Sequence, residues 1–170
     1  MRLKVQNNMK ILFYIRHYFD TWGGIEENVS NISRYLKENN TVSITSDTIN
    51  FSHREYSKEI TYIRHDSVNI KNYDVIFIEN FEILPHFFLC FKIVICKVLK
   101  KYNTTKIILV PHGGFTLDWK LFSLHQRIIK FIYNRIFGLW FINNYCDQVL
   151  AVSEWEKKAL IKEKVKTNII

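Results

Sequence analysis

The sequence predicts an α/β fold, a doubly wound and mainly parallel sheet of the Rossmann-like kind, in one domain of the 170-residue chain. Short, nearly continuous apolar runs alternate with longer segments in which apolar residues recur every three or four positions. Parallel strands that helices cover on both faces are apolar on both sides, and their alternation with helices is typical of a doubly wound sheet.

Six short segments are expected to form strands. They are 10–15, 41–46, 60–64, 74–78, 106–110 and 148–152. The last four residues, 167–170, also look like the start of a strand. We therefore expect the chain to be the N-terminal piece of a longer protein.

Helical periodicity is found in four segments between these strands. They are 25–38, 84–101, 121–145 and a last helix that starts near Ser153. In the first segment, apolar residues recur at i, i+4, i+7 and i+11 from Ile25 to Leu36, which defines one side of a helix. Ser153 and Glu156 have the spacing of a capping box at the start of the last helix.

The chain carries 24 Lys and Arg against 16 Asp and Glu, a net charge of +8. This charge favours an anionic partner. No basic and aromatic cluster accompanies it, so we expect no nucleic-acid partner. Residues 1–8 are polar and form no signal peptide, so they are read as an extension of the domain at 9–170. Three cysteines without C-x-x-C spacing indicate reduced thiols in the cytoplasm.

Gly23 and Gly24 follow the first expected strand and open the first expected helix. Glycine adopts positive φ and has no Cβ, so the backbone can approach a ligand closely. The start of a helix adds unpaired N–H groups and the positive end of the helix dipole. The pair is therefore a candidate phosphate-binding site, with a plain tight turn as the alternative.

His112 and Gly113 follow the expected strand 106–110. In a parallel sheet, ligands bind beyond the carboxyl ends of the strands, where this loop is expected to lie. An imidazole there can donate to a sugar hydroxyl or stabilise developing charge, which makes His112 the candidate catalytic residue. A structural loop histidine is the alternative.

Four more polar residues end strands at the same edge. Glu79 and Asn80 follow the fourth strand, and Ser153 and Glu154 follow the sixth. All four are candidate substrate-binding residues. The histidines and cysteines show no metal-like spacing, and the first strand lacks the G-x-G-x-x-G fingerprint, so neither a metal nor NAD(P) is expected.

The apolar segment 121–142 carries Arg127, Lys130 and Asn134 on one narrow stripe at helical spacing. Charged residues interrupt it too often for a transmembrane helix. One hypothesis is a buried helix with one polar edge in solvent. The other is an interfacial helix that makes peripheral contact with an anionic membrane.

In their order along the chain, four of these motifs resemble the N-terminal domain of family 4 glycosyltransferases of the GT-B fold. The motifs are Gly23-Gly24-Ile25-Glu26, Asp74-Val75-Ile76, Pro111-His112-Gly113 and the segment from Cys146 to Glu154. The resemblance spans Met9 to Ile170. It implies that the chain is the acceptor-side half of a GT-B architecture.

The resemblance implies retaining, metal-independent transfer of a sugar from a nucleotide-sugar donor to a polysaccharide or glycolipid acceptor. It implies that Gly23 and Gly24 approach the donor diphosphate, and that His112 contacts the donor sugar near the reaction centre. The nucleotide-sugar is a substrate, and no other cofactor is implied. The implied location is the cytoplasm, with peripheral contact at the inner face of the membrane.

The sequence departs from the family pattern in two ways. Where the family often has histidines after the fourth strand, this chain has Phe77-Ile78-Glu79-Asn80. The C-terminal domain, whose paired glutamates hold the donor, is not in the sequence. We expect the chain alone to be inactive, as a fragment, a broken reading frame or half of a two-chain enzyme. The alternative function is a non-catalytic α/β module that binds a membrane surface or a protein partner.

Overall fold

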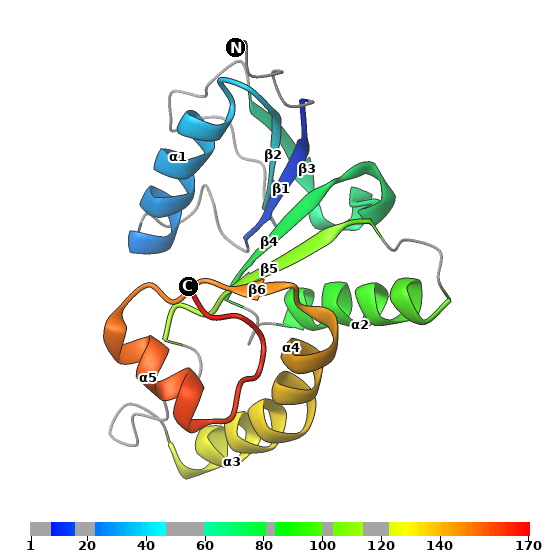
Figure 1. Ribbon diagram of the computed structural model, residues 1–170. Helices are drawn as coiled ribbons and strands as arrows, with labels where there is room; N and C mark the ends of the chain where they lie inside the picture. Colours follow the sequence, from blue (N-terminus) through cyan, green and yellow to red (C-terminus); the bar gives the residue numbers. More distant parts are fainter. Residues whose placement is uncertain (1–7, 16–22, 47–59, 81–83, 100–103, 114–122) are drawn as a thin grey trace, which may run out of the picture.

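The computed structural model describes residues 8–15, 23–46, 60–80, 84–99, 104–113 and 123–170. Six parallel strands form one sheet in the order β3-β2-β1-β4-β5-β6 (Figure 1). The strands are β1 (Lys10–Tyr14), β2 (Thr41–Ser46), β3 (Ile60–Arg64), β4 (Val75–Glu79), β5 (Lys106–Val110) and β6 (Gln148–Val149). The winding direction reverses between β1 and β4, so the predicted doubly wound, Rossmann-like sheet is confirmed.

Helices lie between the strands in the described part of the chain. They are α1 (Gly24–Leu36), α2 (Leu84–Val98), α3 (Leu124–Ile132), the π-helical segment η3 (Tyr133–Gly138), α4 (Leu139–Tyr145) and α5 (Glu154–Lys162), with the short 3₁₀ helices η1 (His65–Ser67) and η2 (Ile70–Asn72). The helix expected over 121–145 is the continuous path of α3, η3 and α4, and its first two residues lie outside the described part.

Both faces of the sheet are covered. Ile11 and Phe13 of β1 belong to a buried cluster with Val29 of α1. Leu12 belongs to a second buried cluster on the other face, with Phe141 of α4. Because successive residues of a strand point to opposite faces, a strand covered on both sides must be apolar at every position. This explains the unbroken apolar run in the sequence of β1.

Strand β6 is shorter than the five residues expected for it. The N–H of Val152 donates to the carboxylate of Glu156 at 2.8 Å instead of to a neighbouring strand, because the chain turns there to begin α5. The strand start expected at the last four residues is a single parallel bridge between Val149 and Ile169.

The orientation of α3 contradicts the hypothesis of a buried helix with one polar edge in solvent for the first part of the segment, whereas Phe141 and Ile142 of α4 are buried. No residue of α3 is buried. The polar stripe lies on the less exposed side instead, with Arg127 and Lys130 half-buried and Asn134 buried. Periodicity shows that a helix has two sides, but not which of them faces the protein.

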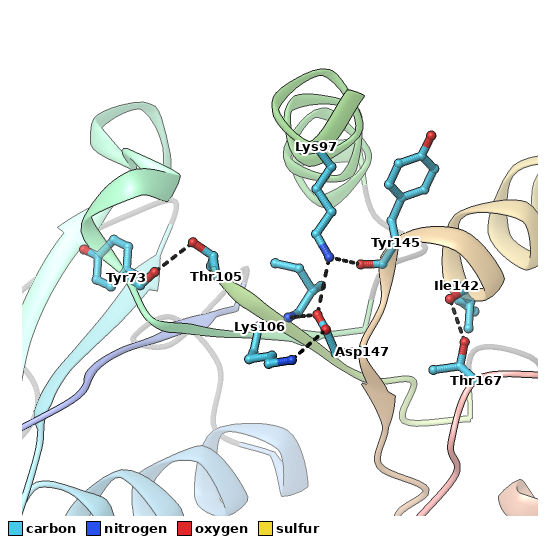
Figure 2. A network of polar contacts seen from close by, with 9 residues as sticks. Tyr73, Lys97, Thr105, Lys106, Ile142, Tyr145, Asp147 and Thr167 are labelled. Carbon is cyan, nitrogen blue, oxygen red and sulfur yellow. Dashed lines mark hydrogen bonds and ion pairs between the residues drawn. The ribbon is translucent and has the colours of Figure 1, made fainter. Parts of the chain in front are cut away.

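Asp147 links β5, β6 and α2 (Figure 2). Its Oδ2 accepts from the backbone N–H of Ile107 at 2.9 Å and from Nζ of Lys97 at 3.3 Å, while its Oδ1 accepts from Nζ of Lys106 at 3.3 Å. Lys97 also donates to the carbonyl of Tyr145 at 2.8 Å. Burial raises the pKa of Asp147, but the N–H of Ile107 and the two lysines outweigh it, so the pKa lies below its ordinary value.

We expect Asp147→Asn to lower the free energy of unfolding by about 1 to 2 kcal/mol at pH 7, because it removes charge-assisted bonds that are only partly screened. The folded pKa lies below the unfolded one, so this contribution is present at neutral pH. It is lost as the pH falls from the unfolded value of about 4 through the folded one. Urea unfolding from pH 7 to pH 3 should show the difference between wild type and variant shrinking.

The matched control is Asp66→Asn. Asp66 forms a surface ion pair with Arg64 at 3.2 Å, and both side chains are about two-thirds exposed. Its removal should change stability by less than about 0.5 kcal/mol. Equal losses in the two variants would show that Asp147 contributes no more than a surface charge.

Candidate functional site

A cavity of about 470 Å³ opens at the carboxyl edge of the sheet. Its walls come from the start of α1 and from the ends of β4, β5 and β6. The lining residues are Gly24, Asn28, Ile32, Phe77, Glu79, Val110, His112, Leu150, Ala151 and Val152. Open parallel sheets bind their ligands at this edge, close to the point where the winding reverses.

Glu79 and His112 form a polar pair in the cavity wall. Glu79 is the last residue of β4 and lies opposite Val110 of β5, which brings it beside the turn that carries His112. His112 Nε2 lies 2.5 Å from Glu79 Oε2. The pair is inside the protein, since the Glu79 side chain is 1% exposed and that of His112 is 10% exposed.

Burial raises the pKa of Glu79, and the hydrogen bond and charge of His112 act against that shift. With the carboxylate ionised, Nε2 of His112 carries the hydrogen between them. Nδ1 is then the ring nitrogen left for a ligand. The carboxylate therefore sets both the angle and the tautomer of the imidazole, as a second group does for many catalytic histidines.

The backbone takes an uncommon conformation next to this pair. Asn80 has φ 58°, His112 has φ 50° and Gly113 has φ 78°. Non-glycine residues in the left-handed region cost about 1 kcal/mol or more, and such residues gather at functional sites. The N–H of Asn80 donates to the carbonyl of Val110 at 2.9 Å, which holds the two strand ends together.

Glu156 holds the turn after β5 from the other side. Its Oε1 accepts a hydrogen bond from the N–H of Gly113, and its Oε2 accepts from the N–H of Val152. The carboxylate is almost fully buried. The predicted capping box is therefore only half formed. Ser153 Oγ accepts from the N–H of Glu156 at 3.2 Å, but the Glu156 carboxylate turns to Val152 and Gly113 instead of to the Ser153 N–H.

Gly23 and Gly24 lie where β1 leads into α1. The N–H of Gly23 donates to Glu26 Oε2 at 2.9 Å, and Gly24 begins the helix and lines the cavity. Gly23 has φ −134°, and Gly24 is helical, so neither needs the positive φ that the sequence suggested. A Cβ on Gly24 would meet no atom within 4 Å. The protein itself gives no reason for a glycine at this position.

Of the remaining candidate site residues, some adjoin the cavity and others do not. Asn80 and Gly113 adjoin the cavity through Glu79 and His112. Ser153 and Glu154 are exposed at the start of α5 and are not among the lining residues, although the preceding Val152 is. Gly114 and residues 16–22 lie outside the described part.

Sequence reasoning missed Asn28 and Glu156 as site residues. Asn28 follows Gly24 by four positions, so both lie on one side of α1, and that spacing could have indicated its place in the cavity wall. No signal in the sequence connects Glu156 with Gly113, which precedes it by 43 residues.

Two histidines hold the end of β1. His86 is fully buried on α2, and its Nε2 lies 3.2 Å from the carbonyl of Tyr14. Nε2 of His65 lies 2.8 Å from the carbonyl of Ile15, and its ring stacks on Tyr14. Among the described residues, no group of three or more His, Cys, Asp or Glu side chains is placed to hold a metal ion.

The strand order defines a Rossmann-like α/β domain, and the cavity at the carboxyl edge is a candidate ligand site to which four elements contribute. Over 96% of its length the chain superposes on HepE of Anabaena, whose crystal structure contains UDP-glucose, with a TM-score of 0.54 and 13% sequence identity. The chain spans 43% of the HepE chain. No protein-family model and no curated protein matches the sequence. At this identity the likeness shows the fold.

We expect Glu156→Gln to lower the free energy of unfolding by about 1 to 3 kcal/mol, because the buried carboxylate loses its charge and one of its two part-buried N–H partners loses its acceptor. Urea unfolding measures the change. The matched control is Glu154→Gln, which removes an exposed carboxylate from the same helix start and should cost less than about 0.5 kcal/mol. Similar losses would contradict the buried role of Glu156.

Proposed function

We propose that the chain is the acceptor-side, N-terminal domain of a retaining family 4 glycosyltransferase. In this proposal it helps to move a sugar from a nucleotide-sugar donor to a polysaccharide or glycolipid acceptor, in the cytoplasm. A second α/β domain, on the same or another chain, supplies the residues that hold the nucleotide.

The observation that carries the proposal is the cavity at the carboxyl edge, where Gly24, Glu79 and His112 meet. The motifs at the ends of β1 and β5 are those that resemble the family. The fold likeness to HepE, a protein crystallised with UDP-glucose, adds support.

Each group has a role in this chemistry. The bond that breaks joins the anomeric carbon to the diphosphate, so negative charge grows on the leaving group. The first N–H groups of α1 and the helix dipole stabilise that charge. His112, oriented by Glu79, contacts the donor sugar through Nδ1, which accepts a hydrogen bond from a sugar hydroxyl when Nε2 carries the ring hydrogen. Gly24 leaves room for the diphosphate to reach the helix start.

We expect His112→Asn to lower kcat by about 100-fold or more, the usual size of such a contribution. Asparagine tolerates the left-handed backbone of this position, so the change removes the imidazole with little added strain. Nucleotide release from UDP-glucose should be measured in the protein that joins this chain to its second domain. His125→Asn, at an exposed position on α3, is the control.

Urea unfolding of both variants separates chemistry from folding. The loss of the partner of Glu79 should cost about 1 to 3 kcal/mol, which leaves a folded protein under assay conditions. If kcat falls no more than the folded fraction does, His112 has a structural role and the catalytic assignment fails.

We expect Gly24→Ala to leave folding intact or slightly improved, because alanine favours a helix over glycine by about 1 kcal/mol and its Cβ meets no neighbour. Binding of UDP-glucose, measured in the protein that joins this chain to its second domain, should weaken by about tenfold because the methyl group takes up space that the diphosphate needs. Asn31→Ala, exposed on the same helix, should not change binding. Unchanged binding in Gly24→Ala would place the diphosphate elsewhere.

A further inference from the structure

One side of α1 forms a wall of the cavity over more than two turns of the helix. Gly24, Asn28 and Ile32 follow one another at intervals of four residues, so they lie on the same side of the helix, and all three line the cavity. The helix start at Gly24 is where the proposed function places the diphosphate. Of these three residues only Asn28 has a polar side chain, and it lies half-buried one turn further along.

The Asn28 side-chain amide is not used by the protein itself. Within the described ranges of the chain, no hydrogen bond joins this amide to another group. The buried Ser33 on the same helix, by contrast, donates to the carbonyl of Ser30 at 3.0 Å. A primary amide donates two hydrogen bonds and accepts at its oxygen. A ligand with hydroxyl groups could therefore satisfy an amide that the cavity wall leaves open.

Phe77 gives the same cavity an aromatic surface. It lies in the middle of β4 and, with Phe13 of β1, faces the side of the sheet that α1 covers. The Phe77 ring stacks on the Phe13 ring with 4.7 Å between the centroids and 12° between the planes, which fixes its orientation. Phe77 is only half-buried and lines the cavity, so part of its ring is left for a ligand.

An aromatic ring next to an open amide fits a sugar ring. The C–H groups on the apolar side of a pyranose are attracted to the negative face of an aromatic ring, while the hydroxyl groups at its edge bond to amides. A wholly apolar ligand would leave the Asn28 amide desolvated without a partner, which costs free energy. The cavity volume of about 470 Å³ lies within the usual range for small-molecule sites, about 300 to 1,000 Å³.

We propose that Asn28 and Phe77 form a subsite for one pyranose ring of the acceptor, stacked on Phe77 and bonded through one of its hydroxyl groups to the Asn28 amide. This inference rests on the proposed function, in which the acceptor must lie beside the donor sugar at His112. All three residues line the one cavity. Asn28 is then a specificity-determining residue, because a site that bonds a hydroxyl group rejects analogues without it.

The test is an NMR titration of the 170-residue chain with the methyl α-glycosides of glucose, galactose and mannose. These probes contain no nucleotide, so their binding does not need the second domain. We expect at least one of them to bind and to shift the signals of the Asn28 side-chain amide. Deoxy analogues of that glycoside, each lacking one hydroxyl group, should include one that binds about tenfold more weakly.

Asn28→Leu removes the amide and keeps a side chain of similar size. The parent glycoside should bind this variant about tenfold more weakly than wild type. The weak deoxy analogue should bind it as well as the parent does, because the bond that both would make is already absent. Asn31→Leu, exposed on the same helix, is the matched control and should bind as wild type does.

Phe77→Leu tests the aromatic surface. It should weaken the binding of the parent glycoside by about tenfold, because leucine offers no ring face for stacking. Phe88→Leu, at an exposed position on α2, is the control. Thermal unfolding of each variant confirms that it folds.

Three outcomes would overturn the subsite. The first is that none of the three glycosides shifts signals of the cavity residues. The second is that cyclohexanol, a ring with a single hydroxyl group, binds as tightly as the glycosides. The third is that every loss seen with the deoxy analogues persists in Asn28→Leu.

Nucleotide release by the protein that joins this chain to its second domain is a separate measurement. Release without glycoside binding would remove the subsite and leave the proposed transferase. Glycoside binding that depends on Asn28, without any release, would leave a sugar-binding domain and remove the transferase.

Discussion

The turn after β5 depends on two buried carboxylates that reach it from opposite sides. Glu79 binds the His112 imidazole, and Glu156 binds the Gly113 N–H. These two bonds offset the cost of a left-handed His112. The two contacts hold one loop to β4 and to the start of α5.

The opposite wall of the cavity is fixed in another way. Gly24 begins α1, which packs on β1 through Val29, and His65 and His86 bind the carbonyls of Ile15 and Tyr14 at the end of β1. Both sides of the site are therefore attached to the sheet through side chains far apart in sequence. Preorganisation of this kind lowers the cost of ordering a site when the ligand binds.

A feature of the fold could be predicted where its signal lies within one short segment of the sequence. Burial on both faces makes β1, β4 and β5 continuously apolar, and that mark is visible without any structure. The placement of Glu79 and His112 at one edge follows from the parallel sheet as well. Their direct pairing does not, because it depends on the register of β4 on β5 and on the backbone of His112.

Contacts between residues far apart in the sequence decided the features that could not be predicted. The spacing of Ser153 and Glu156 predicted a capping box, but the Glu156 carboxylate accepts hydrogen bonds from the N–H groups of Val152 and Gly113 instead. A local motif shows which hydrogen bonds neighbouring residues can form. It does not show which distant donor the fold brings closer. The orientation of α3 was missed for a related reason, since nothing in one helix says which of its sides meets a partner.

Helix α2 has one side on the sheet and one side in solvent. Its inner side carries His86, whose Nε2 lies 3.2 Å from the carbonyl of Tyr14 at the end of β1. Its outer side carries the exposed Phe88 and Phe91. Because the helix also packs on the sheet through buried residues such as Ile93, a shift of the helix would move His86 and disturb the end of β1.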